Sequence, residues 1–528
     1  MSDFDFLKGQ MITGGLSRRG LMSGAAALGI ATTASGLLVP ASALAAETPV
    51  KGGTLRIGLS GGSTTDSIEL GSYNDSVMIA TGHALFNGLV EWSQAGKPVP
   101  ALAASFEPKN GATEWIFSLR KDVKFSNGKL FDADDALYSL NLHRGESKSG
   151  GSGAMKSIKD IKKIDANQIQ ITLDAADADF PYNLTDYHIL MVPNGFKDWA
   201  NPIGTGAFTL EKFEPGVRIA LKGTGSYWKK DRGYLDRVEI TVINDATARL
   251  NALISGQVDA INRVDGKTVA LIEKTGKFDV VRAAGGYHVV MAMTVDAAPY
   301  NNNDLRLAMK YAMDREQILK SLFNGYGKIG NDHPIPESDP YFNTQLAVTK
   351  HDPDKAKFHF KKAGLTDPKI LLQTSEAAFN GATDMATLLQ ASVGKAGIKM
   401  DVKKEAADGF WSNVWLKGPF VGSYWGGRAA ATQMLAIAYK AGANWNETHW
   451  NDAKFEKLLA DSRSETDEAK RKTYIWAMQE MLSTQGGALI PAFKDWVTAN
   501  TKKVGGITPH GGFDMDNGLV CEKAWIKA

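Results

Sequence analysis

The amino-acid sequence predicts an α/β protein built from two lobes. Two stretches, residues 234–261 and residues 369–403, each run in the order strand, helix, strand. That order is typical of α/β units, because a helix must return the chain to the same end of a parallel sheet. An alternating stretch at residues 287–295 lies between them, and we expect this strand to carry the chain from the first lobe to the second.

Each predicted element follows from its residue pattern. Residues 54–59 alternate in hydrophobicity between two glycine pairs and predict the opening strand. Asp132 and Asp135 precede a helical pattern and are expected to cap that helix, which explains the carboxylates there without a metal or acid–base site. Further strands and helices are expected at residues 158–165, 168–173, 234–243, 246–256, 257–261, 299–322, 352–363, 369–373, 384–395, 398–403, 455–459 and 467–482.

Residues 1–46 are expected to be a signal peptide of the twin-arginine type. Arg18 and Arg19 precede an uncharged run from Gly20 to Ala46, and Ala43-Leu44-Ala45 supplies the small residues that a signal peptidase recognises. This cleavage site, and the dilution of the run by small and polar residues, favour a cleaved signal over a membrane anchor. No Cys follows the run, so a lipoprotein anchor is not expected. The mature protein is therefore predicted to be soluble and periplasmic.

The composition argues against several function classes. The sequence has 60 Lys and Arg residues against 58 Asp and Glu residues, which gives a formal net charge of +2. A chain so close to neutral has no electrostatic footprint for nucleic acid or for an anionic membrane surface. Its single cysteine, Cys521, cannot form an intramolecular disulfide.

Three short motifs of enzymes or nucleotide-binding proteins occur in unsuitable contexts. Residues 58–62 fit G-x-S-x-G, but too little chain precedes them to build the neighbouring strands of a hydrolase. Residues 266–268 lack the first glycine of a phosphate-binding loop, and residues 325–330 fit G-x-G-x-x-G but follow a helix instead of a strand. An exported hydrolase is kept as the alternative of another class, but we expect no enzymatic activity and no cofactor.

A hairpin motif points to a protein family. A tight turn at residues 204–206 is followed by predicted strands at 207–211 and 218–222, which Pro215-Gly216 joins. The whole stretch, residues 202–228, resembles the GTGPYxLxxxxPGxxIxLxxNxxYW segment of the peptide-type solute-binding proteins of ABC importers, family 5. The resemblance continues, in order, through essentially the whole mature chain, at residues 84–92, 123–140, 244–261, 299–319 and 352–364.

This resemblance implies the fold of a type II-like periplasmic binding protein. Two α/β lobes would be hinged around a cleft, with an extra subdomain inserted in the first. The implied partner is an ABC permease in the inner membrane, and the protein itself is expected to be a monomer. The implied division is lobe I at residues 47–85, 203–288 and 497–528, the inserted subdomain at residues 86–202, and lobe II at residues 289–496.

The segment Tyr424-Trp425-Gly426-Gly427-Arg428 is the strongest candidate for contact with a ligand. Glycines beside a strand end let a ligand approach the backbone closely. The peptide binders of the resembled family carry acidic residues here, one of which holds the peptide's free amino group, whereas this chain has no acid before Glu447. The planar donor pair of an arginine suits a carboxylate, sulfate or phosphate. Arg428 is therefore predicted to bind an acid group of the solute or, alternatively, to pair with a protein carboxylate at the surface.

Five further residues are weaker candidates for the ligand site. Trp445 and Asn446 offer an aromatic platform and an amide donor, and Trp411 lies in the aromatic-rich stretch before Trp425. His288 lies near the presumed hinge, and Thr65 lies in a loop that the resemblance implies is close to the ligand.

The predicted function is capture of a peptide or peptide-like solute by lobe closure, followed by delivery to the permease. Opine-type conjugates of a sugar and an amino acid are the nearest alternative ligands. A chaperone or signalling receptor with the same fold is a further class. His449 and its acidic neighbours lack the spacing of a metal site, so no metal is expected.

Overall fold

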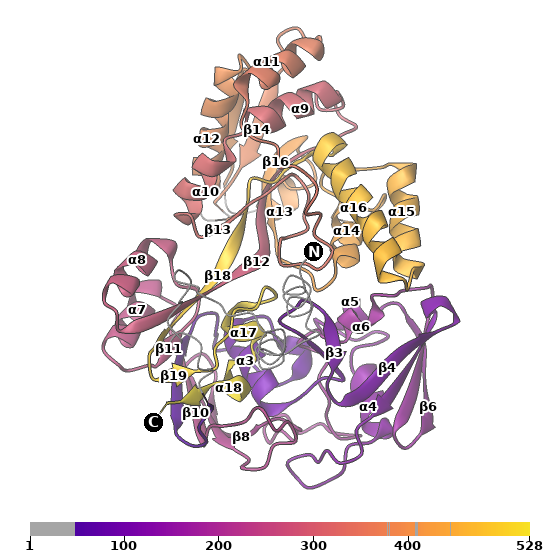
Figure 1. Cartoon of the computed structure of the whole chain (residues 1–528), viewed down its shortest axis with the longest axis vertical. Coiled ribbons are helices and arrows are strands. Elements are labelled where there is room, and N and C mark those ends of the chain that lie inside the picture. Colours follow the sequence, from indigo (N-terminus) through magenta and orange to yellow (C-terminus); the bar gives the residue numbers. More distant parts are fainter. Residues whose placement is uncertain (1–47, 377, 380, 407–409, 444, 528) are drawn as a thin grey trace, which may run out of the picture. The chain divides into compact units, whose positions relative to one another are not determined.

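One β-sheet of twelve strands runs through both predicted lobes (Figure 1). The computed structural model describes residues 48–376, 378–379, 381–406, 410–443 and 445–527, with only the backbone of Trp411 and Ser412. The predicted signal peptide lies outside the described residues. Within them, no helix is both long and apolar enough to cross a membrane.

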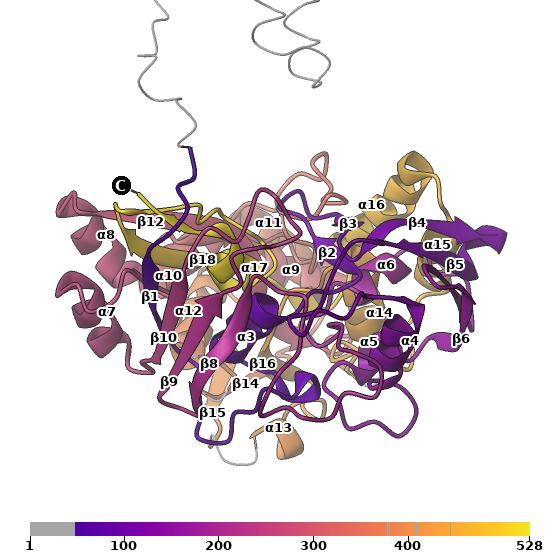
Figure 2. The same cartoon turned by 90° about the horizontal axis from the view of Figure 1, so that it is seen from below.

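The order of the strands in this sheet matches two α/β units joined by a pair of central strands. Its strands are β1 (Thr54–Leu59), β8 (Phe208–Glu214), β9 (Arg218–Gly223), β10 (Arg237–Val242), β11 (Ala260–Ile261), β12 (Phe278–Met293), β13 (Gly327–Ile329), β14 (Ile370–Thr374), β15 (Met400–Lys404), β16 (Phe420–Trp425), β17 (Ala488–Leu489) and β18 (Ala492–Thr501). The main path is β15-β14-β16-β12-β18-β11-β1-β10-β9-β8, and Figure 2 shows β1, β10, β9 and β8 side by side. The strand β1 pairs in parallel with β10 and β11, and β14 pairs in parallel with β15 and β16. The α/β class predicted from the sequence is confirmed.

The strand expected at residues 287–295 is longer than predicted and begins earlier. β12 first pairs with β18 over Phe278–Ala284 and then with β16 over His288–Met293. The ladder with β18 is irregular between Ala284 and His288, where Gly285 and Gly286 lie. This glycine pair made the two halves look unconnected in the sequence, because glycine usually interrupts a strand pattern. The strands expected at 234–243 and 257–261 are shorter than predicted, at 237–242 and 260–261.

The residues of the predicted insertion form a sheet of their own. Its strands are β4 (Ala103–Lys109), β5 (Glu114–Leu119), β6 (Ile158–Asp165) and β7 (Gln168–Leu173), in the order β4-β5-β7-β6, next to a small hairpin of β2 (Val90–Trp92) and β3 (Pro98–Pro100). The two strands expected at 158–165 and 168–173 are confirmed. Helix α4 (Ala133–Asn141) begins with a capping box in which Asp132 and Asp135 exchange hydrogen bonds with each other's backbone, as predicted.

Helices cover the sheets, and many start at a side chain that the sequence marks as a cap. Asp75, Asp245, Asp352 and Asp467, for example, each accept hydrogen bonds from the first turn of their helix.

The remaining short elements are the 3₁₀ helices Leu70–Ser72 and Asn110–Ala112 and the strand pair β19 (Val504–Gly505) and β20 (Trp525–Ile526). The other helices are α3 (Ser76–Leu85), α5 (Ser152–Met155), α6 (Phe180–Asn183), α7 (Ala246–Ile254), α8 (Gly266–Lys274), α9 (Asn303–Ala312), α10 (Arg315–Phe323), α11 (Pro353–Lys362), α12 (Ala382–Lys395), α13 (Phe410–Asn413), α14 (Ala431–Tyr439), α15 (Ala453–Ser464), α16 (Glu468–Gln485), α17 (Asp514–Asn517) and α18 (Val520–Lys523).

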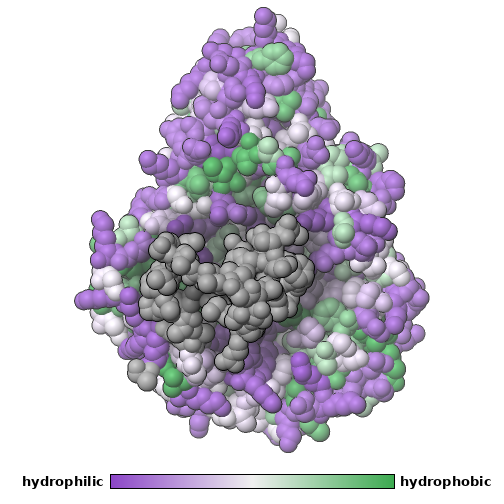
Figure 3. All heavy atoms as spheres, viewed as in Figure 1, coloured by the Kyte–Doolittle hydropathy of each residue, from purple (hydrophilic) through white to green (hydrophobic). Residues whose placement is uncertain are grey.

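Buried apolar residues gather in separate clusters along the shared sheet and within the insertion. One cluster packs β1, β10 and α3, another packs β12 and β14 against α9 and α12, and a third fills the insertion. The surface in Figure 3 is mainly hydrophilic, with apolar side chains in small groups. The division into lobe I, insertion and lobe II stays a prediction, and the three names are used below for the residue ranges given above.

Candidate functional site

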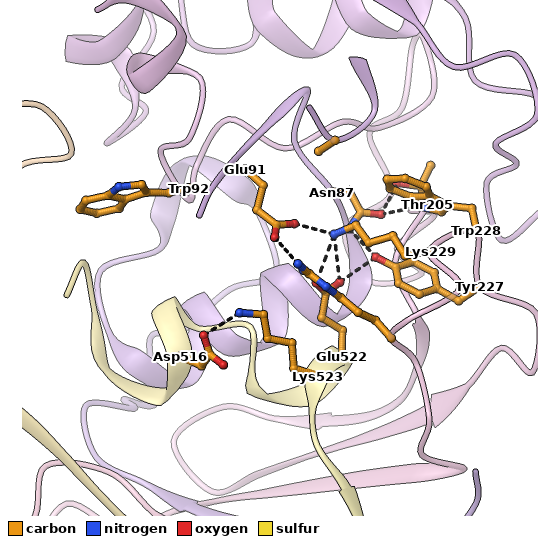
Figure 4. A network of polar contacts seen from close by, with 12 residues as sticks. Asn87, Glu91, Trp92, Thr205, Tyr227, Trp228, Lys229, Asp516, Glu522 and Lys523 are labelled. Atoms are coloured by element: carbon orange, nitrogen blue, oxygen red, sulfur yellow. Dashed lines mark hydrogen bonds and ion pairs between the residues drawn. The ribbon is translucent and has the colours of Figure 1, made fainter. Parts of the chain in front are cut away.

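The hairpin motif at residues 202–228 folds around Asn87 (Figure 4). Asn87 Oδ1 accepts hydrogen bonds from Thr205 Oγ1 and Trp228 Nε1, each at 3.0 Å, and Asn87 Nδ2 donates to Tyr227 OH at 2.9 Å. Asn87 and Thr205 are buried. The polar side chains of the motif therefore hold lobe I to the insertion, and their hydrogen-bonding groups are occupied within the protein.

A buried ion network extends from this joint (Figure 4). Lys229 Nζ lies 2.6 Å from Glu91 Oε2 and 3.1 Å from Glu522 Oε1, and Arg232 forms ion pairs with the same two carboxylates. Tyr227 OH donates to Glu522 Oε2 at 2.6 Å. Burial alone would raise the pKa of Glu91, but Lys229 and Arg232 outweigh it and bring that pKa to about 2. The charges of the two cations and the two carboxylates balance each other. We therefore interpret the network as structural.

The Glu91→Gln substitution should make the protein less stable at neutral pH but not at strongly acidic pH. The folded pKa of Glu91 lies below its ordinary value of 4.5, so its contribution is complete above pH 4.5 and is lost as the pH falls towards 2. We expect the variant to lose about 2 to 3 kcal/mol in the free energy of unfolding at pH 7. Denaturant unfolding at a series of pH values would measure this. The exposed Glu107→Gln is the matched control, and a deficit that stays constant from pH 6 to pH 3 would contradict the assignment.

Asp179 makes a buried polar contact between the insertion and lobe II. It accepts a hydrogen bond from Thr432 Oγ1, near the start of α14, and forms an ion pair with Arg471 of α16. Beside it, Asp177 Oδ2 accepts a hydrogen bond from Arg463 Nη2 at 2.8 Å. Asp177, Asp179, Thr432 and Arg471 are all buried. We call these residues the Asp179 contact, and they join the predicted lobes in the conformation seen here.

A small cavity lies where the predicted lobes meet. Arg428, Gly427 and Asp339 of lobe II line it together with Trp92 and His510 from the other side. Its volume of about 30 Å³ is room for one or two water molecules and too small for a peptide. In this conformation the cavity therefore has no room for a solute of peptide size.

Arg428 is half-buried in this cavity wall and has no carboxylate partner among the described residues. Its Nη1 donates to the carbonyl oxygens of Gly426 at 3.1 Å and Gly427 at 3.0 Å, and among the described residues it makes no ion pair. The carboxylate of Asp186, which acts on Arg428 electrostatically, is 2.6 Å from His188 Nδ1. Burial lowers the pKa of Arg428, with Asp186 among the groups that oppose the shift. The surface salt bridge that was the alternative role for Arg428 is not present among these residues.

Glu447 fixes the tryptophans next to this segment, a role that the sequence did not reveal. Its carboxylate accepts hydrogen bonds from Trp415 Nε1 and Trp425 Nε1, each at 2.7 Å, and from Ser423 Oγ at 2.6 Å. Burial raises the pKa of Glu447, and these three donors oppose the shift. Trp425 is buried, whereas Trp445, whose ring centre lies 5.9 Å from that of Trp425, is 44% exposed. The sequence signal that could have indicated this role is that Glu447 is a single acidic residue among several tryptophans.

Tyr424 and Gly427 meet the central strand β12. The ring of Tyr424 stacks on Tyr287 with centres 5.3 Å apart, and Tyr424 is 41% exposed. A Cβ atom on Gly286 would lie 2.6 Å from the Cα of Gly427, so only glycine allows the two backbones to come this close. The exposed aromatic ring and the close backbone contact therefore lie together at the irregular part of β12.

The other predicted contact residues lie in several environments. His288 is fully buried, with Nδ1 2.9 Å from the carbonyl oxygen of Gly286. Asn446 is buried, and its amide group donates to the carbonyl oxygens of Lys440 and Trp450. Thr65 is exposed in the loop after β1, and the side chain of Trp411 lies outside the described residues. Their contact with a solute stays a prediction.

No metal site is present among the described residues, where no group of three or more His, Cys, Asp and Glu side chains could hold an ion. His449 instead lies 3.0 Å from Asp296 through Nδ1.

The sequence matches a known family model and curated relatives. The model of the bacterial extracellular solute-binding proteins, family 5 Middle, matches residues 97–447. Di/tripeptide-binding protein 1 of Pseudomonas aeruginosa is 25% identical over 450 residues, which cover 77% of this chain and 82% of that protein. Heme-binding protein A of Haemophilus influenzae is 28% identical over 372 residues, which cover 62% of this chain and 68% of that protein.

Solved structures share the fold. The PBP AgaA from A. tumefaciens R10, in complex with agropinic acid, has a TM-score of 0.72 and 26% identity, and the match covers 90% of this chain and 99% of that one. HbpA2 from Haemophilus parasuis has a TM-score of 0.79 at 20% identity, with 90% and 100% covered, and therefore shows the fold alone.

Proposed function

Because the chain belongs to the bacterial extracellular solute-binding proteins of family 5, we propose that it captures a peptide-like solute bearing an acid group. Capture takes place in the periplasm, after export by the twin-arginine-type signal, and the loaded protein delivers the solute to an ABC permease in the inner membrane. The protein acts as a binding component without turnover.

The observation that carries this proposal is the guanidinium of Arg428. It is half-buried at a cavity between the predicted lobes, donates only to backbone carbonyl oxygens of its own segment, and lacks a carboxylate partner among the described residues. A buried charge is usually paired, because the loss of its hydration is otherwise uncompensated. An anionic group of the solute would supply the missing partner through two parallel hydrogen bonds.

Closure of the lobes provides the mechanism. The solute would first contact Arg428 while the lobes are apart, and closure would then bring the insertion against lobe II and form the Asp179 contact. A ligand shifts such an equilibrium only by its extra affinity for the closed state. The exposed rings of Tyr424 and Trp445 would pack against apolar parts of the solute.

Two ligand classes fit the acid-binding role. A peptide or peptide-like compound with a free carboxylate is the first, and AgaA, which is solved with agropinic acid, supports opine-type conjugates as the second. The reason for preferring an acid over a free amino group comes from the sequence and is the same in both cases: Gly427 and Arg428 stand in place of acidic residues.

The test is to identify the solute that the protein carries. Protein purified natively from the periplasm would be denatured and the released small molecules analysed by mass spectrometry. Release of an acid-bearing peptide-like compound in stoichiometric amount is the expected result. Release of a neutral or purely cationic compound, or turnover of the released compound by the intact protein, would overturn the proposal.

A further inference from the structure

A second arginine is positioned on lobe I by a buried aspartate. Asp514 Oδ2 accepts hydrogen bonds from Ser76 Oγ at 3.0 Å, Asn262 Nδ2 at 3.0 Å and Arg263 Nε at 2.9 Å. Arg263 and Asn262 directly follow β11, at the carboxyl end of the parallel strands β1, β10 and β11. Ligands of open α/β sheets bind at this end of the strands.

The outer edge of the Arg263 guanidinium is available to a ligand. Asp514 occupies the Nε atom, and no described residue accepts a hydrogen bond from either Nη atom of Arg263. The side chain is 41% exposed. Arg263 also has a backbone φ of 47°, a left-handed conformation that is uncommon for a side chain of this size and is found more often at binding sites than elsewhere.

Aromatic rings lead from Arg263 towards Arg428. The guanidinium of Arg263 lies 6.0 Å from the ring centre of Trp496 and 5.8 Å from that of Phe513. Phe513 in turn lies 5.4 Å from Trp496 and 6.5 Å from Tyr187. These three aromatic residues are half-buried. Arg428 is close enough to Tyr187 to act on its phenol, although burial dominates and raises the pKa of Tyr187 to about 12.

We propose that the solute is a diacid with an apolar or planar middle, whose two anionic groups are held by Arg263 of lobe I and Arg428 of lobe II. This inference rests on the proposed function and deepens it. Each arginine has donor groups free of protein carboxylates among the described residues, and the rings of Trp496, Phe513 and Tyr187 form a chain of contacts that starts at Arg263. A diacid would therefore contact both lobes with charge, which makes its binding depend on closure.

The test uses diacids and their matched monoamides as probes. N-(1-carboxyethyl)phenylalanine, N-succinylphenylalanine and aspartylphenylalanine, each paired with a form in which one carboxylate is an amide, would be titrated calorimetrically into the full mature chain. The variants are Arg263→Gln and Arg263→Lys, and the matched control is the exposed Arg218→Gln on β9. Circular dichroism and thermal unfolding would verify that each variant is folded.

The expected result is that at least one diacid binds about 10- to 100-fold more tightly than its monoamide. Arg263→Gln should abolish that difference, Arg263→Lys should restore part of it, and Arg218→Gln should leave it unchanged. Equal affinity for diacid and monoamide, a difference that survives Arg263→Gln, or no binding by any diacid would overturn the two-acid inference. The identity of the released native solute tests the proposed function separately. Release of a compound with one acid group would refute only the inference that the solute carries a second acid.

Discussion

Replacing Arg428 with glutamine is expected to lower the affinity for the native solute by about 30- to 1000-fold. Glutamine keeps much of the length and hydrogen-bonding capacity of the side chain but removes its charge. The buried acid of the solute would then lose its ionic partner while it still gives up its hydration. The free protein should remain folded, because Arg428 contacts only the backbone carbonyl oxygens of Gly426 and Gly427 among the hydrogen bonds of the described residues.

Native mass spectrometry of Arg428→Gln isolated from the periplasm would measure the fraction of protein that carries solute. Calorimetry with the released solute would give the affinity. Arg428→Lys is the informative comparison, because it keeps the charge and loses the planar donor pair. An intermediate affinity is expected for it. Full retention of solute by Arg428→Gln would show that this residue does not hold the acid.

The Asp179→Ala substitution is expected to destabilise the closed conformation by about 3 to 5 kcal/mol. Arg471 would stay buried opposite an uncharged side chain, and Thr432 would lose its acceptor. Since Asp179 does not line the cavity beside Arg428, a loss of solute affinity in this variant would come from the equilibrium between open and closed forms.

Small-angle scattering in the presence of solute would detect the shift as a larger radius of gyration, and the dissociation rate of the solute should rise. The triple variant Asp179→Leu, Thr432→Val and Arg471→Met is the control. Well-packed apolar residues often replace a buried ion pair without loss of stability, so this variant should close again. Wild-type scattering and affinity in Asp179→Ala would contradict a closing role for the contact.

Local features of the fold were predictable from the sequence, whereas contacts between distant segments were not. The capping box at Asp132 and Asp135 and the hairpin at 158–173 follow from patterns a few residues long, and the structure has both. The full length of β12 was missed, because Gly285 and Gly286 resemble a break and only the pairing with β18 shows that the strand continues.

The same distinction between local patterns and distant contacts applies to the residues of the candidate site. The segment from Tyr424 to Arg428 could be proposed as a candidate from the sequence, because its composition is unusual and because it lacks the acidic residues of the resembled family. Asp514 and Arg263 could not be paired from the sequence, since nothing in the local pattern of either residue indicates the other. The same holds for Asp179 and Arg471, and for the three hydrogen bonds that Glu447 accepts.

The irregular ladder of β12 has a mechanical consequence. Two adjacent antiparallel strands, β12 and β18, form a ribbon, and regular hydrogen bonding stiffens it from Phe278 to Ala284. Beyond that point the ladder is interrupted at a pair of residues without side chains. A ribbon weakened at one place bends most easily about an axis across its width and resists sliding along its length. For the lobe closure proposed above, we therefore expect a rotation centred on Gly285 and Gly286, limited by the close approach of Gly427 to Gly286.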